Sequence, residues 1–164
     1  MLVLIVTGTP GTGKSFLAKK LSLLIGYGYI DVNKLVKVQR LYDSYNPLMD
    51  TFIVNTNKLS TYLIAIISSA EKGLIIDSHL SHFLPRNYVN LCIVCKCNLK
   101  TLKKRLESRK YSISKIRENL DSEIFDVCYN EAKEIHKEII VADCSTKSSV
   151  QSSIKKIKSA LNHL

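Results

Sequence analysis

The residues with the clearest chemical role lie near the amino terminus, in the segment Gly8-Thr9-Pro10-Gly11-Thr12-Gly13-Lys14-Ser15. This segment matches the pattern G-x-x-x-x-G-K-[ST] and follows an apolar run that indicates a strand. In such a loop the glycines let backbone N–H groups turn inward around phosphate oxygens, and the following helix adds its positive dipole end. Lys14 is expected to reach the β and γ phosphates of a triphosphate, and the Ser15 hydroxyl to ligate Mg²⁺.

A carboxylate at the end of another apolar run is the second candidate. In Leu74-Ile75-Ile76-Asp77, the last residue has the place of an acid that holds Mg²⁺ through water opposite the loop serine. Many strands end in an Asp that only caps a turn, but the upstream loop favours the metal role. His79 either orders this carboxylate or the attacking water, or makes an ordinary loop hydrogen bond.

Basic residues are concentrated between positions 96 and 117, where nine Lys and Arg accompany one acidic residue, Glu107. Arg105 and Arg109 are four residues apart, so on a continuous helix they project from one face. Their planar guanidinium groups suit phosphoryl oxygens whose charge is redistributed during transfer. We predict that both are catalytic, with Arg109 the stronger candidate, and interpret the lysines as a solvated basic face.

Alternating strands and helices must position these groups. Short β-branched runs alternate with longer amphipathic stretches, which is typical of an α/β fold with a parallel sheet flanked by helices. We predict one domain over residues 1–164 with a five-stranded parallel sheet. The predicted strands are Leu2–Val6, Tyr29–Val32, Leu74–Asp77, Leu91–Lys96 and Ile139–Val141. The predicted helices are Lys14–Ile25, Asn33–Tyr42, Asn55–Ser69, Leu99–Ser108, Ile116–His136 and about Ser148–Asn162.

Two stretches interrupt this alternation. The turn-rich piece between Asp43 and Thr51 is interpreted as an inserted segment that faces the substrate. The second, Ser108–Ser114, is a short polar connector in which Ser112 or Ser114 is expected to cap the next helix.

Composition bounds the class of protein. Of 164 residues, 46% are hydrophobic and 23% charged, which excludes a disordered or collagen-like chain. The net charge of +10 favours polyanionic partners such as nucleotides, RNA or a ribosomal surface. No run approaches the roughly 18 apolar residues of a membrane span, and no signal peptide is recognised, so we expect a cytoplasmic protein without a membrane partner.

Five cysteines form an odd set, which indicates thiols in a reducing compartment, although disulfides of the kind found in hyperthermophiles stay open. Cys92, Cys95 and Cys97 lie within a strand pattern and lack a second pair at ligand spacing. We therefore predict that they pack in the core rather than bind metal.

Together these residues resemble a known family, the small P-loop adenylate kinases of archaea and the eukaryotic nucleus, which also act in maturation of the small ribosomal subunit. The resemblance covers most of the chain and is most specific in its second half, because a phosphate loop alone is shared by many unrelated proteins. The resemblance rests on the segments Gly8–Ser15, Gln39–Tyr45, Asp77–His79, Phe83–Pro85, Arg105–Tyr111 and Ile116–Phe125.

The resemblance implies a P-loop NTPase fold of nucleoside monophosphate kinase (NMP kinase) type, with an NMP-binding segment near residues 28–50 and a short lid near 108–118. It implies Mg²⁺-dependent transfer of the γ-phosphoryl group of ATP to AMP or another monophosphate, with side ATPase activity. The residues that it implies for ATP binding are Gly11, Thr12, Gly13, Lys14, Ser15, Phe16 and Arg109.

The chain departs from the family pattern at three positions. Family members usually carry Arg where this chain has Lys37. The monophosphate would then contact the single charge of an ammonium group in place of a planar guanidinium group, unless Arg40 or Arg86 takes that role. Lys110 stands where a Gly usually precedes Tyr111, and Leu80 replaces a usual Gly after the histidine.

The leading hypothesis is thus an adenylate kinase, expected to act as a monomer. The alternative is an ATPase assembly factor in late small-subunit maturation, with a small-subunit ribosomal protein and pre-ribosomal RNA as partners. A weaker alternative is a kinase of RNA or DNA 5′ ends. Base preference, oligomeric state and the redox state of the clustered cysteines stay open.

Overall fold

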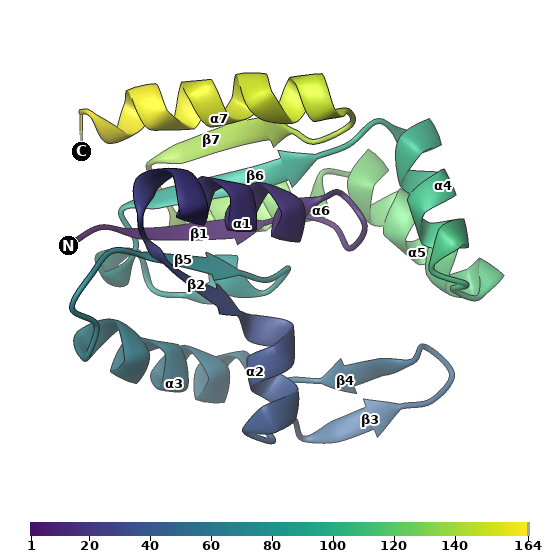
Figure 1. The fold of residues 1–164 in the computed structure, drawn as a ribbon. Coiled ribbons are helices and arrows are strands. Elements are labelled where there is room, and N and C mark those ends of the chain that lie inside the picture. Colours follow the sequence, from purple (N-terminus) through teal and green to yellow (C-terminus); the bar gives the residue numbers. More distant parts are fainter. Residues whose placement is uncertain (164) are drawn as a thin grey trace.

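The computed structural model describes residues 1–163 and has three layers, a central sheet with helices on both faces (Figure 1). The sheet has the strand order β2-β5-β1-β6-β7, and every neighbouring pair is parallel. This confirms the predicted α/β fold with a five-stranded parallel sheet. The strands are β1 (Val3–Thr7), β2 (Gly28–Asp31), β5 (Leu74–Asp77), β6 (Leu91–Lys96) and β7 (Ile139–Asp143).

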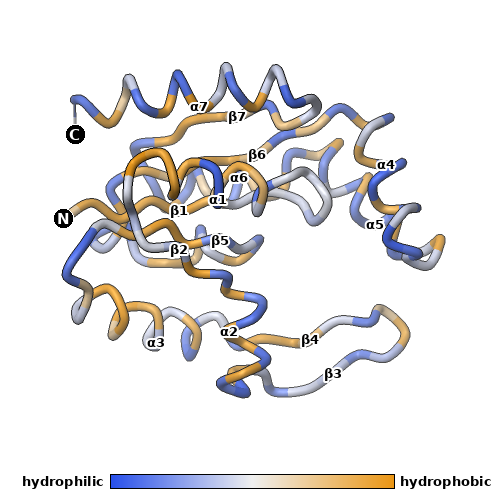
Figure 2. Tube along the Cα trace, in the orientation of Figure 1, coloured by the Kyte–Doolittle hydropathy of each residue, from blue (hydrophilic) through white to orange (hydrophobic). Residues whose placement is uncertain are grey.

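Alternating side chains of the central strand divide the core into two parts. Leu4 and Val6 of β1 pack with α1 (Lys14–Ile25) and α7 (Lys147–Leu161) on one face. Val3 and Ile5 belong to the cluster on the other face, which includes side chains of α2 (Val32–Val38), α3 (Thr56–Ser68) and α6 (Val127–Ile135). This follows from the two-residue period of a strand. Figure 2 shows the strands as largely apolar and the covering helix α7 as alternating between apolar and polar residues.

Two appendages extend from the sheet layer on the same side of the molecule (Figure 1). One is a helical hairpin of α4 (Leu99–Ser108) and α5 (Ile113–Ile124), which has a small core of its own around Leu102 and Leu106. The other is an antiparallel hairpin of β3 (Ser44–Asn46) and β4 (Thr51–Ile53). The two predicted interruptions fall on these appendages, and Ser112 caps α5. We call them the lid hairpin and the β-hairpin.

Two predicted helices were too long. The helix expected to reach Tyr42 ends at Val38, because Arg40 adopts a φ of 53° and the chain turns back so that the Leu41 N–H bonds the Val36 carbonyl. The helix expected over residues 116–136 is two helices, α5 and α6, separated at Asp126, whose φ is 54°. The short 3₁₀ turns η1 (Ser81–Phe83) and η2 (Arg86–Tyr88) follow β5.

None of the helices formed by residues 1–163 combines the length and the apolar composition needed to span a bilayer.

Candidate active site

The phosphate loop joins β1 to α1 in a backbone conformation that requires glycine. A Cβ atom on Gly8 would lie 2.4 Å from the carbonyl oxygen of Cys95, too close for any side chain. Gly13, directly before α1, has a φ of 110°, which L residues rarely adopt. No side chain caps the first turn of α1, so its N–H groups remain available as donors. This geometry suits an anion.

Lys14 is buried within this loop. Only 8% of its surface is exposed, and its ammonium group donates a 3.0 Å hydrogen bond to the carbonyl of Thr9. Burial lowers the pKa of Lys14, because a charged group loses hydration there. An ammonium group has three N–H donors, so two remain for a phosphate that enters the loop.

Asp77 ends β5 as expected and is 3% exposed. Its Oδ2 atom accepts a 2.8 Å hydrogen bond from the Tyr29 hydroxyl on the neighbouring strand β2. Burial, together with this bond and the negative charge of Asp77, raises the pKa of Tyr29. Ser15 also lies near the Tyr29 hydroxyl. The tyrosine thus stands between the two residues expected at the metal, and the sequence analysis missed it.

His79 is half-buried on the wall of the cleft that opens above the loop. Burial and the nearby charge of Lys14 lower the pKa of His79 to about 4. The imidazole is therefore neutral near pH 7, which removes it as a cation but leaves it able to accept or donate a hydrogen bond.

The side chains of Arg105 and Arg109 differ in their contacts, although their helical spacing predicts that they share one face. The Arg105 guanidinium donates to the carbonyls of Thr12 (2.8 Å), Cys144 (2.9 Å) and Ser145 (3.2 Å). A fourth contact, of 3.4 Å, goes to the sulfur of Cys97. Since a guanidinium has five N–H donors, these four contacts leave one N–H of Arg105 without a partner among the residues named here. In this structure Arg105 therefore braces the phosphate loop against the segment after β7, and its contact with phosphate stays a prediction.

Arg109 is exposed at the end of α4 and lines the cleft. Within residues 1–163, no side-chain hydrogen bond fixes the Arg109 guanidinium as the carbonyl contacts fix that of Arg105. Its contact with the nucleotide stays a prediction.

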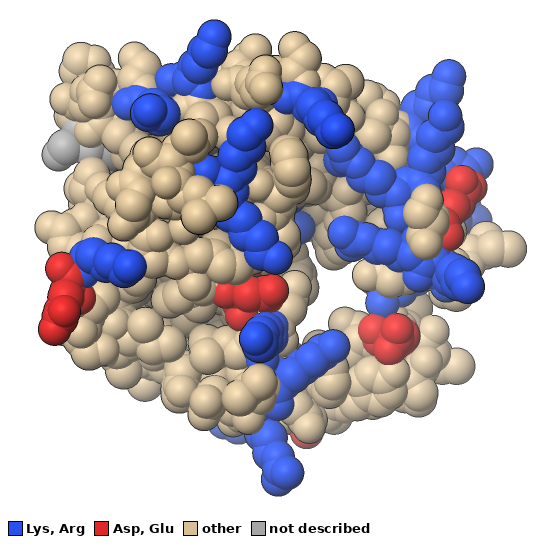
Figure 3. All heavy atoms as spheres, in the orientation of Figure 1, with Lys and Arg blue, Asp and Glu red and all other residues tan. Residues whose placement is uncertain are grey.

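The cleft has a volume of about 1250 Å³ and joins the phosphate loop, the lid hairpin and the β-hairpin. Figure 3 shows it as a hollow with Lys and Arg side chains on its rim. Thr12 and Asp77 are buried behind its wall rather than lining it. The sequence-predicted residues that line it are Gly11, Gly13, Lys14, Ser15, Phe16, Lys37, His79, Arg105 and Arg109.

The three basic residues expected at a monophosphate lie in different places. Lys37 lines the cleft, with its ammonium 5.5 Å from the centre of the Phe52 ring on the β-hairpin. Arg40 is exposed and is not among the lining residues of the cleft. Arg86 lines a different, small depression, which also includes His136 and lies near the amino-terminal ends of β6 and β7. Of the three, the structure brings only Lys37 to the cleft.

The clustered cysteines lie behind the loop. Cys92, Cys95 and Cys97 are buried in or directly after β6, and all five cysteines are free thiols. Burial raises the pKa of Cys92 to about 12, so its thiol stays protonated. Their surroundings are those of core residues.

Comparison with known proteins identifies the family. A family model described as an AAA domain matches residues 4–126. A protein of Methanocaldococcus jannaschii named "Putative adenylate kinase" is 37% identical over 153 residues, covering 93% of this chain and 84% of that protein. The "Adenylate kinase isoenzyme 6 homolog" of Caenorhabditis elegans is 32% identical, covering 90% of this chain and 81% of that protein. The chain belongs to this family of small P-loop adenylate kinases.

Solved structures of other kinases share the fold of this chain. A shikimate kinase from Bacteroides thetaiotaomicron has a TM-score of 0.68 at 15% identity and covers 98% of both chains. A deoxyadenosine kinase from M. mycoides, with bound dATP, has a TM-score of 0.59 at 17% identity and covers 99% of this chain and all of that one. The family member described here thus has the P-loop kinase fold.

Proposed function

We propose that this protein is an adenylate kinase that transfers the γ-phosphoryl group of ATP to AMP. The observation that carries the proposal is the single cleft, which joins a phosphate loop to a second binding wall on the β-hairpin. Pockets for one drug-sized ligand measure about 300–1000 Å³, so a cleft of about 1250 Å³ is larger than a single such ligand requires. The names of the relatives support adenylate as the acceptor.

The donor nucleotide is assigned to the side of the cleft formed by the loop, α4 and the segment after β7. Gly11 and Gly13 would present backbone N–H groups to the phosphates, and Lys14 would bind their outer oxygens. Thr12, whose N–H bonds the Thr9 carbonyl, would shape the loop between the two glycines. Phe16 is 53% exposed at the cleft and would contact the nucleotide with its ring. Arg109 would reach the phosphates from the lid hairpin.

The residues expected at magnesium fit that ion. Ser15 and Asp77 offer hard oxygen ligands, and Mg²⁺ is usually bound by one or two protein groups, substrate phosphates and water. The burial of Asp77 behind the wall agrees with a contact through water. When bound, the ion would neutralise charge on the phosphate oxygens.

The acceptor is assigned to the wall formed by α2 and the β-hairpin. Lys37 would bind the phosphate of AMP as a point charge. Phe52, with Val36 and Val54, offers apolar surface to the base. This wall faces the phosphate loop, which suits direct transfer between two bound nucleotides.

Transfer requires alignment and electrostatic stabilisation rather than a strong base. Lys14 and Arg109 would stabilise the charge that develops on the transferred group, and Arg105 would hold the loop in place. Water that enters the acceptor side would account for slower ATP hydrolysis.

The deciding experiment incubates the protein with ATP, Mg²⁺ and each nucleoside monophosphate in turn, and resolves ADP formation from phosphate release. Formation of two ADP from ATP and AMP is the expected result. Phosphate release without transfer to any monophosphate would reject the kinase in favour of an ATPase.

A second candidate is an ATPase assembly factor that binds a small-subunit ribosomal protein and pre-ribosomal RNA. The distribution of charge favours it, because α7 has lysines and no acidic residue, and Lys and Arg gather over the lid hairpin (Figure 3). Binding to RNA should weaken steeply with added salt. Undetectable or salt-insensitive binding to small-subunit particles would count against this candidate.

A further inference from the structure

Glu123 is a buried carboxylate outside the catalytic residues discussed so far. It lies in the last turn of α5, where its surface is 5% exposed. A negative charge at the carboxyl end of a helix opposes the helix dipole, and α5 has no basic residue in this turn to offset it. Burial adds a further cost, so the position is unfavourable unless other parts of the chain bind the carboxylate.

Those partners come from the phosphate loop and from β6. The Thr9 hydroxyl donates a 2.7 Å hydrogen bond to Oε2, and the Cys97 N–H donates one of 2.9 Å to Oε1. The Lys96 ammonium lies 3.5 Å from Oε1 and also donates to the carbonyl of Glu123 itself. The carboxylate therefore joins the lid hairpin to the sheet and, separately, to the loop.

Thr9 carries this connection to the catalytic lysine. It is 1% exposed, and its carbonyl accepts hydrogen bonds from Lys14 Nζ (3.0 Å) and from the Thr12 hydroxyl (2.8 Å) and N–H (3.2 Å). Thr9 thus binds α5 through its side chain and binds Thr12 and Lys14 through its carbonyl.

The same helix also faces the nucleotides. The side chains of α5 that line the cleft follow helical spacing on one face, which adjoins the face of Glu123. They are Lys115, Glu118, Asn119 and Ser122. If α5 moves when the lid hairpin closes, the amino-terminal half of α5 would therefore shift the wall of the cleft. The last turn of α5 would at the same time shift Thr9.

We propose that Glu123 is a positioning residue for the phosphate loop: through the Thr9 hydroxyl it sets the loop backbone that holds Lys14, and so links the position of lid helix α5 to ATP binding. The inference depends on the proposed function only in that the loop binds a nucleoside triphosphate. It does not depend on AMP as the acceptor.

The test removes the link at Thr9, because truncation of the buried Glu123 would leave the Cys97 N–H without a partner and risks unfolding. Thr9→Val deletes one hydroxyl at nearly constant volume, and Thr9→Ser restores it. ATP binding with Mg²⁺ is measured by calorimetry for each variant, and thermal melting checks folding. We expect Thr9→Val to weaken ATP binding about ten-fold, the scale of a hydrogen bond to a charged group, and Thr9→Ser to recover most of it.

A double-mutant cycle separates positioning from general bracing of the fold. Glu123→Gln keeps the shape and removes the charge, and its effect on ATP affinity should largely disappear in the Thr9→Val background. Asp121→Asn, an exposed carboxylate on the same helix, is the matched control and should bind ATP as the parent does.

Steady-state kinetics supply the second readout. The Thr9 and Glu123 variants should raise KM for ATP. KM for AMP should stay within about two-fold of the parent value, a smaller change than the loss of one neutral hydrogen bond produces. Normal ATP binding by Thr9→Val, or additive effects in the cycle, would overturn the proposal. If AMP is not a substrate, the proposed function fails while the binding measurements still decide this inference.

Discussion

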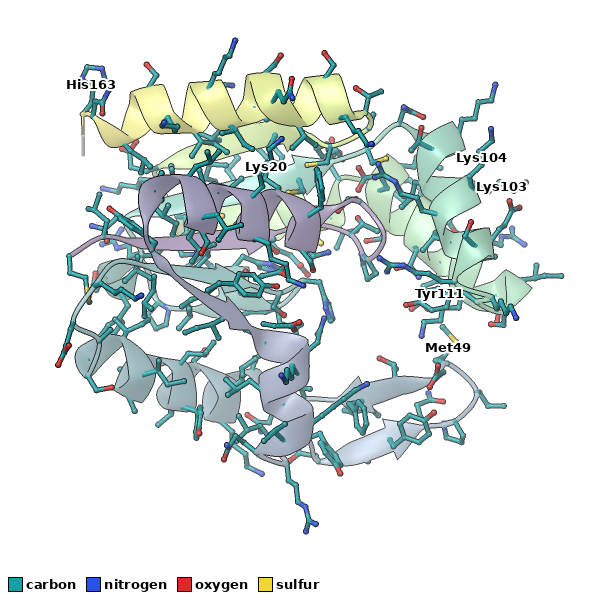
Figure 4. All side chains as sticks on the ribbon, in the orientation of Figure 1. Lys20, Met49, Lys103, Lys104, Tyr111 and His163 are labelled. Atoms are coloured by element: carbon teal, nitrogen blue, oxygen red, sulfur yellow. The ribbon has the colours of Figure 1, made fainter. Side chains whose placement is uncertain are left out.

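The Lys115 ammonium, in the first turns of α5, donates a 2.9 Å hydrogen bond to the backbone carbonyl of Asp50 in the turn of the β-hairpin. The same ammonium lies 4.2 Å from the centre of the Tyr111 ring. In Figure 4, Tyr111 of the lid hairpin and Met49 of the β-hairpin lie opposite one another at this contact. The two appendages thus meet across the mouth of the cleft, which they both line.

This contact predicts that Lys115→Met weakens the acceptor site. Without the bond, the β-hairpin loses its tie to the lid hairpin, and we expect KM for AMP to rise about three- to ten-fold, the range of one hydrogen bond. Initial rates at varied AMP and saturating ATP measure the effect. Lys103→Met on the outer side of α4 is the control (Figure 4) and should leave KM unchanged. An unaltered KM in Lys115→Met would contradict the prediction.

Lys14→Met should reduce phosphoryl transfer by orders of magnitude, because the variant removes the one ammonium group held inside the loop. Single-turnover formation of ADP measures the chemical step apart from product release. Lys158→Met on α7, an exposed position far along the chain from the loop, provides the comparison. Near-normal turnover by Lys14→Met would remove the mechanism proposed above.

Asp77→Asn should increase the Mg²⁺ requirement. The amide keeps an oxygen for the Tyr29 hydroxyl but lacks the charge that would hold the hydrated ion. Loss of an outer-shell partner typically costs about 10- to 100-fold in metal affinity, and we expect a shift of that size in the Mg²⁺ concentration for half-maximal rate. Chelation by EDTA should abolish the activity of the parent protein. An unchanged Mg²⁺ titration would exclude Asp77 from the metal site.

Stability should fall in mild acid because of His82, together with His79, whose pKa is also lowered to about 4. The His82 ring is 1% exposed between the Thr7 hydroxyl (2.7 Å) and Glu131 (3.0 Å), and burial together with nearby His136 lowers its pKa to about 4 from an ordinary 6.5. The unfolded chain therefore binds more protons between these two values. The stabilisation by the neutral ring is complete above about pH 6.5 and is lost as the pH falls toward 4.

Urea unfolding between pH 7.5 and about 4.5 measures this dependence. His82→Gln lowers stability at neutral pH but should make the decline on acidification shallower, with His79 supplying the remainder. His163→Gln, at the exposed carboxyl-terminal end (Figure 4), is the control and should reproduce the decline of the parent protein. A decline of the same slope in His82→Gln would assign the pH dependence to other groups.

Lys110→Gly should stabilise the protein. Lys110 follows the end of α4 with a φ of 57°, where a side chain costs about 1–2 kcal/mol, and this is the position at which the family resemblance led us to expect glycine. We expect the free energy of unfolding to rise by about 1 kcal/mol. Lys104→Gly, inside the same helix, should lower it by about as much. A melting temperature of Lys110→Gly no higher than that of the parent protein would show that backbone strain at position 110 is negligible.

The sequence determined the parts of this protein that depend on neighbouring residues. The phosphate loop, the bounds of α1 and α4, and Asp77 at a strand end all follow from local spacing, since turns, helices and strands are governed by residues a few positions apart. The ends of α2 and α5 were missed because Arg40 and Asp126 adopt positive φ without being glycine, which periodicity does not reveal.

Which distant groups meet depends on the packing of the whole chain. Tyr29 reaches Asp77 because β2 and β5 are neighbours in the sheet, an order that hydrophobic pattern does not encode. Thr9 and Glu123 are 114 residues apart, and they meet because the lid hairpin folds back onto the ends of β1 and β6. Contacts of this kind arise from the order of strands and the packing of helices, to which residues along the whole chain contribute together.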